Sequence, residues 1–295
     1  MYSRLTYIIL LLTLLLANPA VANMEFDGNA SYSFNDNVSN AVSDNDIFED
    51  SLVTANFNAA KLWIPGAGKS LLLSGHLGAE KYNDSTGLDR YSYGTSLAYI
   101  QRLGLGAYAA RIKTGFRAEY RDFDTDMRDG MLYRASVGLE KRFTPELIAG
   151  ATLTRERRTA DADKTVPYFA LAPSDVFNQN NSELEAYISY TLINNSVITA
   201  RYLLRHGELN ASTNPASAFF NYAKAIGQDY EICKACGKYV VYKVGANVQA
   251  LQLDWNWALG RDTSVSANYE RRIADANGGV TYTGNIYKIQ LSRRF

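Results

Sequence analysis

The chain has 295 residues, with 30 basic and 30 acidic side chains, 21 tyrosines, two cysteines and two histidines. Its net charge is zero, and we expect no nucleic-acid partner. After residue 20 no apolar run reaches the roughly 20 residues of a membrane-spanning helix, so any membrane span must consist of β-strands.

The N-terminus has the three parts of a secretory signal peptide. Arg4 precedes an apolar block from Tyr7 to Leu16, and Ala20-Val21-Ala22 follows as a small-residue cleavage site. We therefore predict that residues 1–22 are a signal peptide and that residues 23–295 form one β-barrel domain. An uncleaved signal anchor is the alternative.

Twelve segments then alternate between apolar and polar residues, which is the repeat of a strand with one apolar and one polar face. The predicted strands are 25–35, 51–63, 70–82, 90–102, 107–123, 131–143, 147–158, 182–192, 196–208, 240–259, 263–273 and 282–295. In the tenth, the apolar residues before and after Ala250 are out of phase. We expect either a β-bulge near Ala250 or a strand that extends beyond the membrane.

The connections alternate in length. Those after even strands are short, whereas those after odd strands are polar and mostly longer, up to residues 159–181 and 209–239. This alternation is typical of a transmembrane, antiparallel, up-and-down β-barrel with periplasmic turns and extracellular loops. A soluble β-sandwich would also alternate, but it does not require this parity of short and long connections.

The face predicted to point into the lumen is densely charged. Its basic residues are Arg111, Lys113, Arg117, Arg121, Arg134, Arg142, Arg201 and Arg205. Charges inside a narrow barrel must be paired or solvated. One hypothesis is an interlocking salt-bridge plug. The other, which the one-sided basic run from Arg111 to Arg121 favours, is a water-filled pore whose basic wall attracts anions.

Two further features are candidates for chemistry. His206 has the lipid-facing parity and shares it with Glu208, which suggests a lipid hydrolase at the barrel rim, but the neighbouring positions in the sequence hold no serine. Cys233 and Cys236 lie in the longest loop, where an oxidising compartment favours a local disulfide over a redox role. We assign no catalytic residue, cofactor or metal ion.

The last segment alternates up to the final residue, with Tyr287, Ile289, Leu291 and Phe295 on one face. This ending resembles the C-terminal signature of Gram-negative outer-membrane β-barrels, although Arg293 stands where a hydrophobic residue is more usual. The resemblance implies location in the cell outer membrane. It also implies that the barrel assembly machinery recognises these four residues, and that lipid and lipopolysaccharide surround the barrel.

These features predict a porin-like channel for passive diffusion of small polar or anionic solutes. Two alternatives stay open at this point. One is a non-conducting barrel whose extracellular loops bind a surface partner or polymer, and the other is an outer-membrane lipid hydrolase or deacylase.

Overall fold

The computed structural model describes residues 24–161, 175–193, 195–213, 222–229, 232 and 239–295. The predicted signal peptide, residues 1–22, lies outside the described residues, as do Cys233 and Cys236. Among the described residues, no helix is long and apolar enough to cross a membrane.

The described residues form one antiparallel sheet. Its strands are β1 (Met24–Asn35), β2 (Asp50–Gly66), β3 (Lys69–Tyr82), β4 (Arg90–Arg102), β5 (Arg111–Phe123), β6 (Gly130–Arg142), β7 (Leu147–Ala160), β8 (Gln179–Thr191), β9 (Ser196–Thr213), β10 (Ala225–Gln228), β11 (Val240–Ala258), β12 (Thr263–Ala276) and β13 (Val280–Arg294). Two short 3-10 helices, η2 (Thr86–Leu88) and η3 (Asp126–Arg128), lie in connections.

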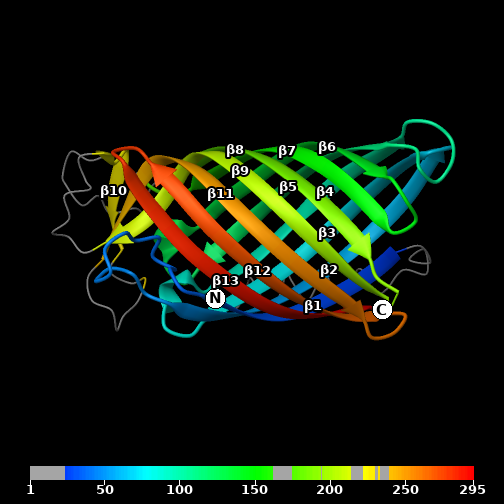
Figure 1. Cartoon of the computed structure of the whole chain (residues 1–295). Helices are drawn as coiled ribbons and strands as arrows, with labels where there is room; N and C mark the ends of the chain where they lie inside the picture. The colour runs from blue at the N-terminus through cyan, green and yellow to red at the C-terminus, as the bar shows by residue number, and fades with distance from the viewer. Residues whose placement is uncertain (1–23, 162–174, 194, 214–221, 230–231, 233–238) are drawn as a thin grey trace.

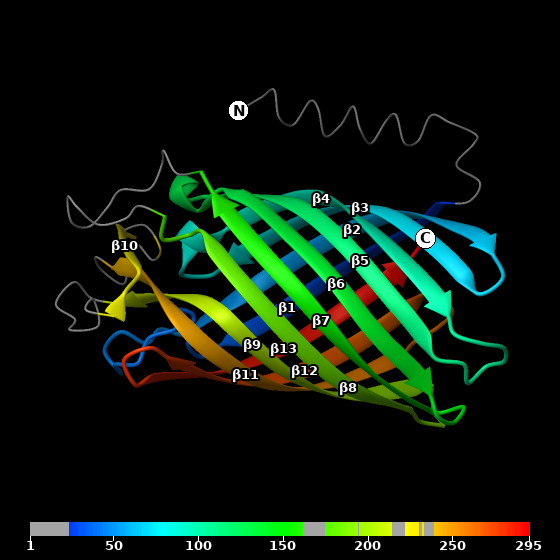
Figure 2. The same cartoon turned by 90° about the horizontal axis from the view of Figure 1, so that it is seen from above.

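Twelve of these strands close into a barrel, which confirms the predicted fold (Figures 1 and 2). The first strand pairs with the last, from Asp27 opposite Arg294 to Asn35 opposite Ile286, and β9 pairs with β11. Closure leaves no unpaired edge within the membrane, where an unsatisfied backbone group would cost several kcal/mol. The remaining strand, β10, pairs only with the start of β11 and was not predicted.

The exterior is an apolar band. Along β4, Tyr91 and Tyr93 are exposed at 70% and 48%, and Leu184 and Ile188 continue the band on β8. Trp255 and Trp257 stack on the outer surface of β11 with ring centroids 6.3 Å apart. Such exposure of large apolar side chains around a closed barrel is stable only in contact with lipid.

Most predicted strands match the structure to within four residues at each end, but the tenth contradicts the expected bulge. The pairing of β11 with β9 runs without a register shift from Val240 to Trp257. The phase change instead coincides with the first part of β11, which is buried on both faces at the barrel end with the longer loops. Extension of the strand beyond the membrane, the other expectation, stays a prediction. After Ala250, from Leu251 to Trp257, the apolar residues face lipid. Before it, Tyr242, Val244 and Val248 face inward and are buried.

Loop length predicts the orientation of the barrel. Cysteines introduced at Asp84, Asp126 and Asn277, all exposed at the end with the longer loops, should react with an impermeant reagent on intact cells. Cysteines at the exposed residues Glu146 and Asn195, at the opposite end, should react only after the outer membrane is permeabilised. The reverse labelling pattern would show that the short turns face outward.

Candidate functional site: the charged lumen and its mouth

The inward face of β5–β9 is predominantly basic. Strand register places nine basic and five acidic side chains on it. The basic residues are Arg111, Lys113, Arg117, Arg121, Arg134, Arg142, Arg158, Arg201 and Arg205, and the acidic residues are Glu119, Glu140, Glu156, Glu183 and Glu185. All eight predicted lumen residues therefore share one wall, to which the structure adds Arg158.

Glu119 is the most buried of these carboxylates, with 3% of the residue exposed. It accepts hydrogen bonds from Arg117 and from Arg121 Nε, the latter at 2.7 Å. Its other contact is His76 Nε2 on β3, at 2.9 Å. Three side chains from two strands therefore converge on one carboxylate, which supplies the pairing that a buried charge requires.

The contact between His76 and Glu119 passes over β4, which lies between their strands. The residue at the crossing is Gly94, directly opposite both partners in register. A Cβ atom at Gly94 would lie 2.7 Å from His76 Cε1 and 2.2 Å from the Ala118 carbonyl oxygen. Only glycine therefore fits between these two side chains.

Two further carboxylates each hold two basic side chains. Glu140 contacts Lys113 Nζ at 2.6 Å and Arg111 Nη1 at 3.8 Å. Glu156 contacts Arg134 Nη2 at 2.6 Å and Arg205 Nη2 at 3.2 Å. Each carboxylate is thus outnumbered by its partners, so the pairing neutralises only part of the positive charge.

The remaining predicted lumen residues differ in their partners. Arg201 lies 3.4 Å from Glu185 and 3.0 Å from Asp254 on β11. Within the described part of the chain, Arg142 has no carboxylate within 4.0 Å. Several ion-paired side chains also keep much of their surface open, namely Lys113 at 43%, Arg117 at 43% and Arg134 at 46%. This wall is therefore paired but accessible to water.

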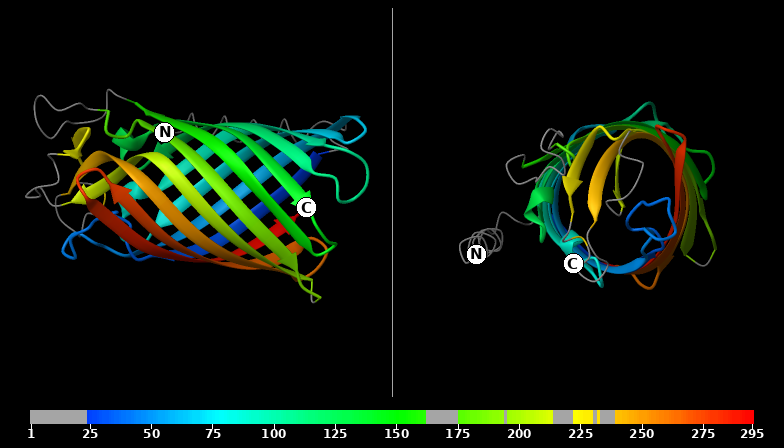
Figure 3. Two further views of the ribbon diagram at one scale, coloured as in Figure 1. Left: turned by 45° about the horizontal axis from the view of Figure 1, so that its top comes forward. Right: turned by 90° about the vertical axis from the view of Figure 1, so that its left-hand side faces the viewer.

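The mouth, defined here as the barrel end with the longer loops, is crossed by packed side chains. The first part of β11 is buried on both faces. One face packs Tyr242 and Val244 against Ala274 and Tyr282 of β12 and β13. The other packs Val241 against Phe177, which precedes β8. The first part of β11 therefore lies inside the mouth, between the β12–β13 side of the barrel and the segment before β8 (Figure 3, right).

Phe177 also contacts two arginines, one in η3 and one in β7. The guanidinium carbon of Arg128, in η3, lies 4.5 Å from the centroid of the Phe177 ring, and that of Arg158 lies 5.9 Å from it. Arg128 also donates a hydrogen bond of 2.5 Å to Asp229, which follows β10 and is fully buried. A buried ion pair thus joins η3 to the segment after β10, 101 residues apart.

Residues 36–49 fold into the same mouth, as the blue loop in Figure 3 shows. Ser212 N donates to Ser39 O at 2.8 Å, and Thr213 Oγ1 donates to Asp46 at 2.5 Å. Phe48 packs edge-on against Tyr239, with ring centroids 5.5 Å apart. Burial, reinforced by the Asp46 carboxylate, raises the pKa of Tyr239, so this ring stays neutral at physiological pH.

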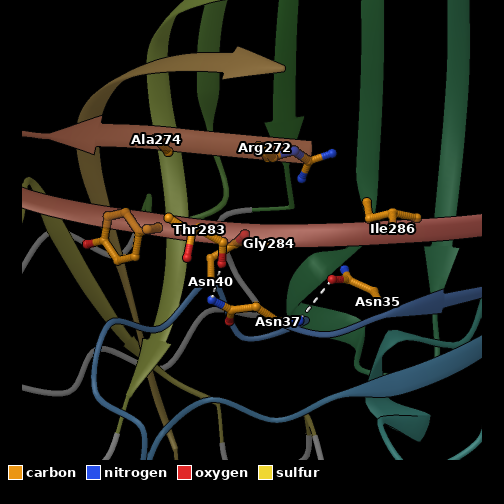
Figure 4. Close-up of a pocket in the computed structure, with 9 residues that line it drawn as sticks. Asn35, Asn37, Asn40, Arg272, Ala274, Thr283, Gly284 and Ile286 are labelled. Carbon is orange, nitrogen blue, oxygen red and sulfur yellow. Dashed lines mark hydrogen bonds between the residues drawn. The ribbon is translucent and has the colours of Figure 1, made fainter. Parts of the chain in front are cut away.

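Asn37 fixes the beginning of this loop against the barrel wall (Figure 4). Its backbone N–H binds Asn35 Oδ1 at 3.0 Å, and its side-chain amide donates to Thr283 O on β13 at 2.9 Å. The cavity beside it has a volume of about 10 Å³, enough for one water molecule. This contact is therefore an anchor for the loop and offers no space for a solute.

The residues that build the mouth were not found from the sequence. Arg128, Phe177 and Asp229 lie in polar connections, and no periodicity relates them. The only local signal is the apolar run at Val240–Val244, which was recognised as out of phase but not as a packing surface. Its partners lie on several segments remote in sequence, so pattern reading along one segment could not identify them.

No protein-family model and no curated protein sequence matches this chain. Solved structures do resemble it. An outer membrane channel from Pseudomonas putida F1 has 8% identity and a TM-score of 0.59, covering 92% of this chain and 96% of that one. The NanC porin has 13% identity and a TM-score of 0.44, with 91% and 98% covered. Outer membrane phospholipase A from Escherichia coli has 8% identity and a TM-score of 0.44, with 92% of each chain covered.

At 8% identity the likeness to the Pseudomonas channel concerns the fold alone. Combined with the closed twelve-strand barrel and the apolar exterior, it defines the class of protein. The chain is an outer-membrane β-barrel protein, and its location is the outer membrane.

Proposed function

We propose that the protein is a porin-like channel for small polar solutes, with a preference for anions. The observation that carries this proposal is the excess of basic over acidic side chains on the inward face of β5–β9. Positive charge along a narrow, low-dielectric wall raises the local concentration of anions. The similar barrel from Pseudomonas putida F1 is an outer membrane channel, which is consistent with this proposal.

The exposure of the paired side chains favours a pore over a salt-bridge plug. In a dry plug, Lys113 and Arg134 would be almost fully buried, because such a plug excludes water and leaves each charge in contact only with its partners. Their exposure of 43% and 46% leaves room for water and ions beside each pair. In water, two unit charges 4 Å apart attract by only about 1 kcal/mol, which biases a passing anion without trapping it.

The proposal includes the partners of an outer-membrane channel. Lipid and lipopolysaccharide would contact the apolar band, and the assembly machinery would recognise Tyr287, Ile289, Leu291 and Phe295. Tyr287, Ile289 and Leu291 lie on β13 and are exposed on the outer face beside β12, and Phe295 directly follows the strand. The Cys233–Cys236 disulfide remains a prediction.

Charge reversal in the lumen tests the proposal. Lys113→Glu combined with Arg134→Glu removes one basic partner from Glu140 and one from Glu156, and leaves Arg111 and Arg205 in place. Each carboxylate then keeps one cation, so the barrel should fold. In planar bilayers with a salt gradient, the reversal potential should move towards the cation equilibrium potential, because four units of charge change on the wall.

A matched control reverses two charges on the exterior. Lys81→Glu with Arg157→Glu changes the same formal charge at exposed, outward-facing positions on β3 and β7. This variant should keep the wild-type reversal potential. Equal shifts in both variants would mean that surface charge, and not the lumen wall, sets selectivity. A wild-type protein that never conducts would favour the non-conducting alternative, in which the loops bind a partner.

A further inference from the structure

Four polar residues form a row across the outer surface of the barrel near its mouth. They are Arg155 on β7, Ser182 on β8, His206 on β9 and Asn247 on β11. In register, each lies directly opposite the next. Directly opposed residues have Cβ atoms about 4.5–5.5 Å apart, so adjacent members of the row are within side-chain reach. The serine missing from the sequence around His206 is thus supplied by a neighbouring strand.

The sequence suggested Glu208 as the partner of His206. In the structure the partner is Asn247. Asn247 Oδ1 lies 2.7 Å from His206 Nδ1, whereas Glu208 binds Asn180 N and Lys224 Nζ. An amide oxygen can only accept a hydrogen bond, so this contact places the proton on Nδ1. Nε2 then carries the lone pair and is the basic nitrogen of the ring.

Ser182 has the complementary contact. Its Oγ accepts a hydrogen bond from Arg155 Nη1 at 2.7 Å. A hydroxyl has one proton to donate in addition to its acceptor lone pairs. The contact with Arg155 therefore leaves the Ser182 proton available. Ser182 and His206 are directly opposed in register but are not hydrogen-bonded to each other in the structure, so a side-chain rotation would have to bring the proton to His206. The contact with Arg155 also places a positive charge beside the oxygen, where an oxyanion would develop.

The row lies at the edge of the exposed apolar band. One outward-facing position further from the mouth, the same strands carry Leu153, Leu184 and Leu204, which belong to the apolar band. Same-face neighbours on a strand are about 6.6–6.8 Å apart, so the row begins where the hydrocarbon ends. Beside it lies a groove of about 410 Å³, lined by Arg155, His206, Asn247, Glu208 and Lys224, and Ser182 lies next to this lining and not in it.

A boundary position alone would explain polar residues here, since the barrel leaves the hydrocarbon at this level. It would not explain a histidine hydrogen-bonded through Nδ1 and a directly opposed serine beside a guanidinium. A nucleophile, a base and a group that orients the base are the components of a hydrolytic triad, and triads are recognised by geometry and not by sequence order.

We propose that Ser182, His206 and Asn247 form a lipid-facing esterase site, independent of the channel function. Ser182 Oγ attacks the carbonyl carbon of an acyl ester while His206 Nε2 takes its proton. The ester C–O bond breaks, and His206 returns the proton to the departing alcohol. Water, activated by His206, then attacks the acyl-serine, releases the fatty acid and restores Ser182. Arg155 stabilises the oxyanion, and Asn247 is the positioning residue.

The surroundings indicate the substrate class. Arg155 and Lys224 both line the groove, but Lys224 is held in an ion pair by Glu208 at 3.1 Å. The Arg155 guanidinium beside the ester site therefore favours a lipid that carries a phosphate. The apolar band below the row would hold the acyl chain. The substrate is therefore an acyl ester of a phosphate-bearing membrane lipid, which glycerophospholipids and lipid A both provide.

The test uses the refolded full-length protein in detergent micelles containing either phosphatidylethanolamine or lipid A, with released fatty acid measured by mass spectrometry. The arm that yields fatty acid identifies the lipid. Ser182→Ala and His206→Ala should each lower the rate on the order of 10³-fold. A fluorophosphonate probe should label the wild type at Ser182, as located by peptide mapping, and should not label the Ser182→Ala variant.

Matched controls separate chemistry from folding. Ser189→Ala removes an inward-facing hydroxyl from the same strand, and Gln249→Ala removes an outward-facing amide from β11. Both should retain wild-type rates. Asn247→Asp keeps an acceptor for His206 Nδ1 and should retain most of the wild-type rate, whereas Asn247→Leu removes the acceptor and should lower kcat with KM nearly unchanged. A purely structural Asn247 would respond alike to both substitutions.

Two results would overturn the assignment. One is a wild-type protein that releases no fatty acid from either lipid above the protein-free blank. The other is an Ser182→Ala variant as active as the wild type, which would trace the activity to a contaminant. Because ester hydrolysis needs no conductance, and conductance needs no Ser182, failure of either function leaves the other measurable.

Discussion

Asp229→Ala should open the mouth of the barrel and raise the mean single-channel conductance in planar bilayers. Asp229 is fully buried and pairs with Arg128 at 2.5 Å. Removing one partner of a buried ion pair costs about 3–5 kcal/mol, because the other charge remains buried. Each 1.4 kcal/mol changes an equilibrium tenfold, so the packed arrangement should lose about 100-fold to 4000-fold in population relative to open ones.

A large effect is expected because the ion pair between Arg128 and Asp229 connects η3 to the packed side chains of the mouth. Arg128 also stacks on Phe177, which packs against Val241 on β11. Loss of the Asp229 carboxylate should draw the Arg128 guanidinium towards water and away from Phe177. The expected record shows longer or larger openings than the wild type, with the same barrel stability in heat-modifiability gels.

A double variant is the matched control. Arg128→Met with Asp229→Leu replaces both charges by apolar groups of similar size, an exchange that is often neutral or stabilising for buried ion pairs. The double variant should conduct like the wild type. If Asp229→Ala and the wild type are both silent at every voltage, the mouth is not a gate, and the channel proposal fails with it.

Deletion of Phe295 should remove most of the protein from the outer membrane while leaving the purified barrel able to fold. Phe295 N donates a hydrogen bond to Phe26 O at 2.9 Å, at the end of the seam between β1 and β13. The seam is otherwise held by paired residues from Asp27–Arg294 to Asn35–Ile286. One lost backbone hydrogen bond costs only about 0.5–1.5 kcal/mol, so stability alone does not predict a large loss.

The large effect is expected from recognition. Phe295 is 71% exposed, and its ring contacts Arg293 through a cation–π interaction with a separation of 5.7 Å. The ring is thus presented on the outside of the barrel, where an assembly factor can bind it. The measurement compares outer-membrane levels of the deletion strain with refolding yields of the same protein in detergent.

Two substitutions sharpen this prediction. Phe295→Tyr keeps an aromatic terminus and should assemble at nearly wild-type levels. Arg293→Leu restores the more usual hydrophobic residue and should assemble at least as well as the wild type. Normal outer-membrane levels of the Phe295 deletion would show that the last residue is not an assembly signal. Failure of the deletion to refold in detergent would assign its effect to the seam.

The lumen illustrates how far sequence reasoning reached. Alternation placed Arg117 and Arg121 on one face with Glu119, and the structure confirms that arrangement. It could not show that His76 reaches the same carboxylate over Gly94, because that contact depends on strand register between three strands. The outer row follows the same rule, since Ser182 and His206 are 24 positions apart and meet only through the pairing of β8 with β9.

The sequence by itself determined the twelve strands, their lipid-facing and lumen-facing residues and the parity of the loops. The strands and their faces depend on a local period of two, which the bilayer imposes on every strand separately, and the loop parity follows from the lengths of the connections between them. Tertiary structure alone decided which charges pair, which loops pack in the mouth and which outer residues form a row. These contacts join segments distant in the chain, and their geometry is set by register, closure of β1 on β13 and the burial of both faces of β11.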